Sequence, residues 1–443
     1  MQKRSIQAPA AAVLAGTVAL ALAAGAGCGK LDPIRAPAPV TGSADFSNYV
    51  AIGTSVSMGI QSAGIVEDLQ QNSFPALLAG VTGANGGNFV QPLVPTPGIP
   101  PIMRIAGFGP TGSPIFGVRP GTPPAGPSTP RPADGYDNLG ISGAVVANAL
   151  AKTSGDDPAH YFDLVLQGQG TMVRQCLAQD PTFVTVELGV NDAVRAILGG
   201  SDTYATGAAE FQALYTQLLD SLAAGAPNAK LALANVIDVT QIPYATTVPL
   251  DVTGPFGPGG AVVTIRLRDA AGPLPNGSLV LLPAGQLVPL GYGFPAPAPP
   301  LPDSLVITVA ERANIEQRVR DFNTVIAAQA QARGAALADA NGLFAAIAAR
   351  GIVLGGTRYT TRYVSGGLFS LDGVHPNSLG YGLFANEFVR AINARFGASI
   401  PPVDLARLQD VPAASVAGIQ PAAAARAVDP AALAVLRASL LGE

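Results

Sequence analysis

Three short apolar runs constrain the fold of this chain most strongly. They cover residues 49–52, 183–188 and 231–236, and they carry almost no alternating polar residues. Strands with this character have both faces covered, as in parallel sheets. Apolar residues recur at helical spacing in 208–224 and 309–333. Strands that alternate with helices predict an α/β fold, in which a parallel sheet carries helices on both faces.

The rest of the chain extends this pattern and interrupts it twice. A short strand is expected at 335–340, after Gly334, which suits a helix end, and a long helix is expected at 378–396. Two insertions rich in Pro and Gly, at about 82–135 and 244–303, leave room for few regular elements. Within the second, "AVVTIRLRD" and "GSLVLLP" predict the two strands of a β-hairpin. We interpret 46–400 as a single domain.

The first residues have the pattern of an export signal. Lys3 and Arg4 precede an apolar stretch at 9–24, and small residues lead to Cys28. This pattern resembles a bacterial lipoprotein signal, although Gly25 stands where such signals usually have Leu. The resemblance implies a signal peptide at 1–27, a lipid on Cys28 and a Pro-rich tether at 28–45. It predicts a protein of the cell envelope, at the outer membrane in a Gram-negative host. Simple secretion or a periplasmic location is the alternative.

Charge and cysteine content exclude several classes of protein. Lys3 and Arg4 are the only charged residues of 1–27, so their removal takes the formal net charge from −4 to −6. An acidic chain without a basic face is a poor candidate for nucleic-acid binding. A lipidated Cys28 would leave Cys176 as the only thiol, which allows neither an internal disulfide nor a Cys-rich metal site. We expect Cys176 to be a small buried apolar residue. The Ala-rich tail at 401–443 is assigned no chemistry.

Two segments contain residues suited to nucleophilic catalysis. In "AIGTSVSMG", Ser55 follows the first expected strand and Gly53. It is either a nucleophile at the end of a strand or part of an ordinary helix N-cap. Asp372 and His375 lie in one short turn before the last helix. The carboxylate can accept the Nδ1–H of the imidazole, which leaves Nε2 free as a base. The alternative is a satisfied surface turn.

Two further segments offer hydrogen-bond donors. Gly140 and Gly143 mark a junction between strand and helix, where a backbone N–H can face a ligand. Asn191 follows the buried run 183–188 and could donate its side-chain N–H to a developing oxyanion. A plain tight turn and a helix N-cap are the alternatives. His160, the other histidine, lies outside all four segments, and we expect it to be structural or exposed.

In this order, the four segments resemble the blocks of the SGNH (GDSL-type) hydrolase family. The matching residues are 53–55, 138–143, 189–192 and 372–375, and the resemblance covers 46–80, 136–240 and 310–397. It implies a flavodoxin-like three-layer α/β/α sandwich, with ligands at the carboxyl ends of the strands. It also implies that Ser55 is the nucleophile, His375 the base and Asp372 the group that orients it. The oxyanion hole would consist of the Ser55 and Gly143 N–H groups and the Asn191 side chain. No cofactor and no metal are implied.

One residue departs from the family pattern. Thr54 stands where the family usually has Asp, a residue that resembles a structural anchor for the nucleophile turn. Thr can accept and donate a hydrogen bond but brings no charge.

The resemblance predicts a serine esterase or lipase that forms an acyl-enzyme on Ser55. Its substrate would be a small-molecule or lipid ester, and its lipid anchor would hold it at a membrane. A carbohydrate-ester deacetylase or phospholipase of the same fold is an alternative, as is a non-catalytic surface lipoprotein that uses the fold for binding. The complete set of five site residues argues against the last, because a binding module does not need all of them. The sequence predicts no oligomeric state.

Overall fold

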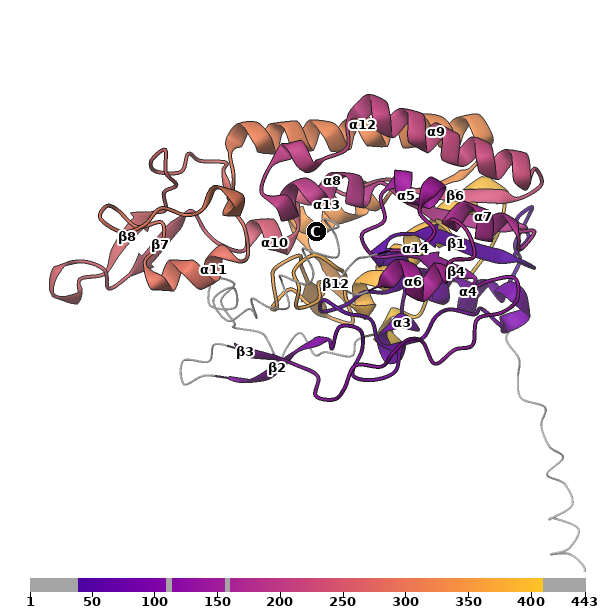
Figure 1. Cartoon of the computed structure of the whole chain (residues 1–443), viewed down its shortest axis with the longest axis horizontal. Helices are drawn as coiled ribbons and strands as arrows, with labels where there is room; N and C mark the ends of the chain where they lie inside the picture. Colours follow the sequence, from indigo (N-terminus) through magenta and orange to yellow (C-terminus); the bar gives the residue numbers. More distant parts are fainter. Residues whose placement is uncertain (1–38, 109–113, 156–159, 409–443) are drawn as a thin grey trace, which may run out of the picture. The chain divides into compact units, whose positions relative to one another are not determined.

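The computed structural model describes residues 39–108, 114–155 and 160–408 (Figure 1). The expected signal peptide, Cys28 and nearly all of the expected tail lie outside these residues. Residues 39–45, which we expected to belong to the tether, are packed on the domain instead. Val40 forms a β-bridge with Ser399, and Ala44 is buried in the core. Within the described ranges, no helix has the length and apolar character needed to cross a membrane.

Five parallel strands form the central sheet. In spatial order they are β11 (Ala336–Ala338), β6 (Lys230–Ala234), β5 (Phe183–Glu187), β1 (Tyr49–Gly53) and β4 (Asn138–Gly140). Taken in chain order, these strands follow the flavodoxin-like arrangement 2-1-3-4-5. The predicted parallel α/β sheet is therefore confirmed.

Alternate side chains of each strand point to opposite faces of the sheet, and in β1 and β5 all of them are buried. Helices therefore cover both faces. Val50 and Ile52 of β1 belong to one core, with residues of α5 (Val146–Ala151), α7 (Met172–Leu177), α9 (Ala208–Gly225) and α12 (Val309–Arg333). Tyr49 and Ala51 belong to the other core, with residues of α4 (Phe74–Thr82) and α14 (Ser378–Phe396). The two longest helices of the first core, α9 and α12, pack along each other (Figure 1). Cys176 is fully buried in α7, as expected.

Local sequence signals explain the ends of the long helices. Thr308 and Glu311 form a capping box at the start of α12. Gly334 ends this helix at a φ of 62°, in the left-handed region that glycine adopts without steric cost. Asn377 caps α14 by accepting the backbone N–H of Gly380. The predicted bounds of α12 and α14 are confirmed.

The two insertions contain small antiparallel sheets. In the first, β2 (Met103–Phe108) pairs with β3 (Pro114–Val118). In the second, the expected pairing is wrong. β8 (Val263–Arg266) pairs with β7 (Asp251–Gly254), and β9 (Leu279–Val280) pairs with β10 (Val306–Ile307). The physical reason is the turn at 257–260, Gly-Pro-Gly-Gly, which favours a local hairpin between β7 and β8.

The remaining α-helices and strands are shorter than α9, α12 and α14. They are α2 (Ser55–Met58), α3 (Glu67–Gln70), α6 (Tyr161–Leu166), α8 (Val190–Gly199), α10 (Pro243–Thr246), α11 (Ala284–Leu287), α13 (Ala340–Arg350), β12 (Ile352–Leu354) and β13 (Thr357–Tyr359). Three of them begin at the carboxyl ends of central strands: α2 follows β1, α8 follows β5 and α13 follows β11, each after one or two residues. The strand order reverses between β1 and β5, and open α/β sheets bind ligands at the carboxyl ends of the strands at such a point.

Candidate active site

Ser55 begins the short helix α2 at the carboxyl end of β1. Thr54 caps this helix, and its Oγ1 accepts the backbone N–H of Val56 at 3.3 Å. Gly53 is required before the turn, because a Cβ there would lie 1.8 Å from the Oγ of Ser57. Such close packing fixes the turn that presents Ser55.

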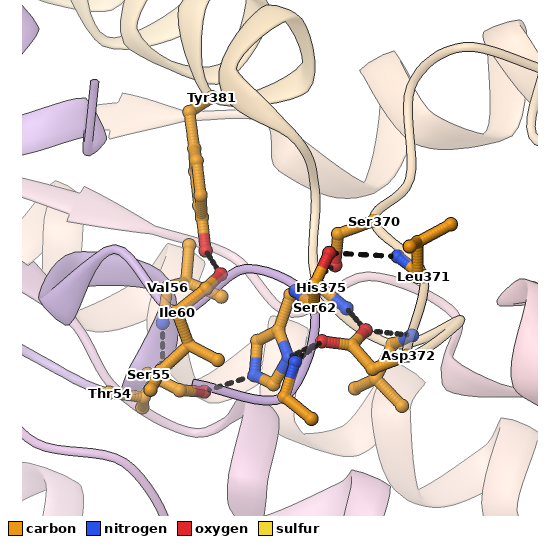
Figure 2. A network of polar contacts seen from close by, with 12 residues as sticks. Thr54, Ser55, Val56, Ile60, Ser62, Ser370, Leu371, Asp372, His375 and Tyr381 are labelled. Carbon is orange, nitrogen blue, oxygen red and sulfur yellow. Dashed lines mark hydrogen bonds and ion pairs between the residues drawn. The ribbon is translucent and has the colours of Figure 1, made fainter. Parts of the chain in front are cut away.

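The structure brings Ser55, His375 and Asp372 together from opposite ends of the domain (Figure 2). The Nε2 atom of His375 lies 2.9 Å from the Oγ of Ser55, and its Nδ1 atom lies 3.0 Å from Oδ2 of Asp372. All three side chains are buried. In this arrangement the imidazole can accept the hydroxyl proton of Ser55 while the carboxylate fixes its tautomer and balances its charge.

The Asp372 carboxylate is held by backbone donors as well as by the imidazole. Its Oδ1 accepts the N–H groups of Val374 and His375 at 2.8 and 2.9 Å, and its Oδ2 accepts the N–H of Ala63 at 2.8 Å. Burial alone would raise the pKa of Asp372, but the charge and hydrogen bonds of His375 and the Val374 N–H outweigh it. The pKa is therefore lowered, and the carboxyl stays ionised.

A strained segment between α2 and α3 supplies the Ala63 donor. Ser62 and Ala63 have φ values of 54° and 65°, which are uncommon for residues other than glycine. The N–H of Ser62 donates to Ser370 Oγ at 2.9 Å, and the N–H of Leu371 donates to Ser62 Oγ at 3.3 Å (Figure 2). Hydrogen bonds from this segment therefore hold the turn that carries Asp372. Sequence reasoning missed it, because neither serine belongs to a recognisable motif.

A buried carboxylate, Glu187, anchors the turn around Ser55 through hydrogen bonds. Its Oε2 accepts the backbone N–H of Thr54 and the Oγ–H of Ser57, each at 3.0 Å. The Thr54 hydroxyl lies 3.0 and 2.9 Å from the two oxygens of Glu187. Burial raises the pKa of Glu187 to about 7, against the lowering effect of the hydrogen bonds from Thr54 and Ser57.

Glu187 also explains how the turn is anchored although Thr54 has no charge. The carboxylate belongs to Glu187 at the end of β5, and Thr54 donates hydrogen bonds to it. Sequence analysis missed Glu187, and the signal that could have found it was an acidic residue near the end of the largely apolar run "FVTVEL". A charge in such a run is costly to bury without partners, which makes it a candidate for a specific role.

Asn191, in α8, contacts the turn that contains Gly143. The Nδ2 of Asn191, in the first turn of α8, donates to the carbonyl of Ala144 at 3.0 Å. Gly143 precedes Ala144 and has a φ of 79°. Asn191 lines one hollow together with Ser55 and His375, whereas Gly143 is not among its lining residues and joins the group through Ala144.

Asp192 fixes the position of α8. Its Oδ2 accepts the N–H of Val146 at 3.1 Å, and its Oδ1 accepts the hydroxyl of Thr206 at 2.8 Å. Burial raises its pKa to about 6, although these hydrogen bonds and the charge of Arg195 lower it. The contact to Val146 ties α8 to the start of α5.

The remaining predicted residues lie away from this site. His160 is exposed at the N-cap of α6, with its Nδ1 3.8 Å from Oδ2 of Asp163. Cys28 lies outside the described residues. In the described part of the chain, no group of three or more His, Cys, Asp or Glu residues could hold a metal ion.

Several solved structures resemble the chain at low identity. An acetyl-xylooligosaccharide esterase from Geobacillus Stearmophilus is 14% identical, with 78% of this chain and 93% of that chain covered and a TM-score of 0.33. An extracellular lipase from Streptomyces rimosus and a phospholipase A1 from Streptomyces albidoflavus are each 15% identical. For both, 78% of this chain and 98% of the other are covered, with TM-scores of 0.32 and 0.31. A search of curated proteins found no match.

A family model gives a more direct match. The model for the GDSL-like lipase/acylhydrolase family matches residues 49–388, a range that contains the whole relay of Ser55, His375 and Asp372. It also spans all five strands of the central sheet. The chain therefore belongs to the GDSL-like lipase/acylhydrolase family.

Proposed function

We propose that this protein hydrolyses carboxylic esters through an acyl-enzyme on Ser55. The observation that supports this most directly is the continuous relay from Ser55 Oγ to His375 Nε2, at 2.9 Å, and from His375 Nδ1 to Asp372, at 3.0 Å. A hydroxyl within hydrogen-bond reach of a base, which a third group orients, is the arrangement of an activated nucleophile.

The reaction follows from these contacts. His375 Nε2 takes the proton of Ser55 Oγ as this oxygen attacks the ester carbonyl carbon. The tetrahedral intermediate collapses, the bond to the alcohol oxygen breaks, and His375 gives its proton to the departing alcohol. A water molecule then attacks the acyl-enzyme with the same proton transfers, which releases the acid and restores Ser55.

The developing oxyanion needs donors near Ser55. The backbone N–H of Ser55 lies in the first turn of α2, where helix geometry offers no intrahelical partner. The side-chain amide of Asn191 has two N–H groups, and one of them donates to the carbonyl of Ala144. With Gly143 as the third donor, the oxyanion hole would match the one that the sequence suggested. A single donor of this kind is typically worth roughly 10²–10³-fold in rate.

Replacement of the nucleophile tests the proposal. Ser55→Ala should lower the hydrolysis of p-nitrophenyl butyrate by at least about 10³-fold and abolish labelling by a serine-reactive fluorophosphonate, while the circular dichroism spectrum stays unchanged. Ser47→Ala, at an exposed serine, is the control and should keep the parental rate. Parental activity in Ser55→Ala would show that the nucleophile lies elsewhere.

We also propose that a lipid on Cys28 holds the protein at a membrane. Lys3 and Arg4, the apolar stretch and the small residues before Cys28 support this. Two or three acyl chains anchor a protein stably, whereas one does so only marginally. Cys28→Ser should move the protein from the membrane fraction to the soluble fraction, or block its processing. A mature N-terminus other than a modified Cys28, found by intact mass, would refute the anchor.

A further inference from the structure

Two β-hairpins carry exposed apolar side chains on the two insertions. Hairpin β2–β3 belongs to the first insertion and hairpin β7–β8 to the second, and both extend toward the same end of the described domain (Figure 1). Ten large apolar side chains are exposed in the described ranges, and six of them lie in the two insertions. These six, which we call the hairpin surface, are Phe108, Ile115, Val118, Phe256, Val262 and Leu290. Exposed apolar residues that gather in this way, rather than lie scattered, mark an interaction site.

Apolar contacts hold the second hairpin beside the loop that carries Leu290. The ring of Phe256, in the turn of the hairpin, packs edge-on against Phe294 with ring centroids 4.8 Å apart. Leu290 comes shortly before Phe294 in the chain and is 73% exposed, and Val262 is 71% exposed. The three exposed side chains of the second insertion therefore lie in one part of it.

Charged residues lie at the bases of the two hairpins and not in the parts that project. The sequence has no charged residue in 105–118 or in 252–265. Arg104 is exposed on β2, and Arg266 of β8 forms an ion pair with Asp251 of β7 at 3.0 Å. An uncharged apolar tip beyond a base that contains arginine is typical of segments that enter the interface of a lipid bilayer, because the long arginine side chain keeps its charge among the headgroups.

The hairpins are long enough for such an arrangement. Phe256 follows Asp251 by roughly 17 Å of extended strand, and Phe108 follows Arg104 by roughly 13 Å. Segments that bind at the interface bury their apolar face by about 5–10 Å. The aromatic side chains can therefore reach the hydrocarbon boundary of a bilayer while the charged residues stay outside it.

Both insertions are rooted at the rim of the active site. Met103, the first residue of β2, donates its N–H to the carbonyl of Ser62 at 2.8 Å, in the segment that holds the carboxylate of the relay. Tyr244, in the helix α10 that leads to β7, donates its N–H to the carbonyl of Gly373 at 2.8 Å, just before His375. A bilayer in contact with the hairpins would therefore lie on the same side of the domain as the relay.

The proposed anchor on Cys28 would leave this orientation open. The chain between Cys28 and Pro39, the first described residue, spans at most roughly 40 Å. It then leads to the amino end of β1, whereas Ser55 follows the carboxyl end of this strand. A tether at the opposite edge of the sheet does not by itself bring the relay to the bilayer. Only a second contact would fix which side of the domain faces the lipid.

We propose that the hairpin surface is a docking site for a lipid bilayer, in which its apolar side chains enter the hydrocarbon boundary and Arg104 contacts the headgroups. A fluid bilayer can take up side chains on two separate projections, whereas a protein partner would need a surface that matches both in shape. The docking concerns the orientation of the domain, so it goes beyond the proposed hydrolysis and does not depend on it.

Single tryptophan reporters test the docking, because the chain contains no Trp. Phe256→Trp and Phe108→Trp place the reporter in the hairpin surface, and Tyr204→Trp, at an exposed aromatic residue outside the insertions, is the matched control. Each is made in the full chain together with Ser55→Ala, so that the lipid is not hydrolysed. The probe is a vesicle of phosphatidylcholine and phosphatidylglycerol whose acyl chains carry bromine, which quenches only a tryptophan that reaches them.

Both hairpin reporters should shift to shorter emission wavelengths and lose most of their fluorescence on brominated vesicles, whereas Tyr204→Trp should keep its emission. Hairpin reporters that stay unquenched would overturn the docking and leave a protein partner for this surface. Equal quenching of all three would overturn it as well, since the contact with lipid would not be specific for the hairpins. Ester hydrolysis plays no part in this readout, so a failure of the proposed function would not affect it.

A charge placed in the hairpin surface provides a second comparison. Val262→Asp should raise the vesicle concentration needed for half-maximal quenching of the Phe256→Trp reporter at least about fivefold, because the carboxylate would have to leave water. Val353→Asp, at an exposed valine of β12, is the matched control and should leave that concentration unchanged. Equal effects of the two substitutions, or no effect of Val262→Asp, would contradict the docking.

Discussion

Glu187 holds the turn that presents Ser55 through hydrogen bonds on both sides of the serine. Thr54 precedes Ser55 and Ser57 follows it, and both donate to the same buried carboxylate. All these partners are donors, which suits an ionised carboxylate, because a carboxylate only accepts. The side chain thereby fixes both flanks of the proposed nucleophile without touching it.

Replacement by the neutral isostere should show that Glu187 acts by positioning. In Glu187→Gln, the amide NH₂ would face the donors of Thr54 and Ser57, so the turn should shift. We expect kcat to fall roughly 10- to 100-fold with little change in KM, since a small misplacement of a reacting group has effects of this size. Thr54→Ser keeps the hydroxyl and should retain most of the activity. An unchanged kcat in Glu187→Gln would contradict the positioning role.

The two histidines allow a matched test of the base. His375→Ala should lower ester hydrolysis by at least about 10³-fold, because no other imidazole can take the Ser55 proton. His160→Ala should change the rate by less than about twofold, since this side chain is exposed and pairs with Asp163. The rates of both variants with p-nitrophenyl butyrate check this expectation. Loss of activity in His160→Ala alone would make the site assignment wrong.

At the scale of elements, the segment from Ile60 to Ala63 joins the two halves of the site. It follows α2, which carries Ser55, and it contacts the turn that carries Asp372. Tyr381 of α14 donates its hydroxyl to the carbonyl of Ile60 at 2.6 Å (Figure 2). A left-handed residue other than glycine costs about 1–2 kcal/mol, so two in succession must be held by surrounding contacts.

Removal of one of those contacts should affect both stability and activity. Ser370→Ala leaves the buried N–H of Ser62 without its acceptor and should lower the free energy of unfolding by about 1–3 kcal/mol. It should also lower kcat, because the Ala63 donor to Asp372 would shift. Urea unfolding and ester hydrolysis measure the two effects. Ser221→Ala, at a half-buried serine of α9 whose hydroxyl donates to the Gln217 carbonyl of the same helix, is the control. Equal behaviour of the two variants would contradict the role of the segment.

At the scale of the whole molecule, buried carboxyl groups make stability depend on pH. The pKa of Glu187 is raised from 4.5 to about 7, and that of Asp192 from 3.8 to about 6. Between pH 4.5 and about 7 for Glu187, and between pH 3.8 and about 6 for Asp192, the folded protein binds more protons than the unfolded chain. The free energy of unfolding therefore falls as the pH rises through these two ranges. The lowered pKa of Asp372 acts in the opposite direction and costs stability only in strong acid.

We therefore expect the folded domain to be more stable at pH 5 than at pH 8. Glu187 alone should contribute a difference of about 2–3 kcal/mol in the free energy of unfolding. Urea unfolding at the two pH values measures it, and in Glu187→Gln this contribution should disappear. Equal stability of the parent at both values would show that Glu187 keeps an ordinary pKa in the folded state.

Local sequence signals were enough to predict the main elements, and the family resemblance predicted the relay, whereas the contacts that hold the relay arise only in the folded chain. Buried strands and capped helices have such signals, so the parallel sheet, α12 and α14 could be predicted. The grouping of Ser55, Asp372 and His375 followed from the resemblance of the four short segments to one family. The contact of Glu187 with Thr54 depends on the register that places Gly53 opposite Glu187 in neighbouring strands. The hydrogen bond from the Ala63 N–H to Asp372 joins segments that are far apart in the chain. No local pattern encodes such contacts, because they exist only once the sheet has brought the two segments together.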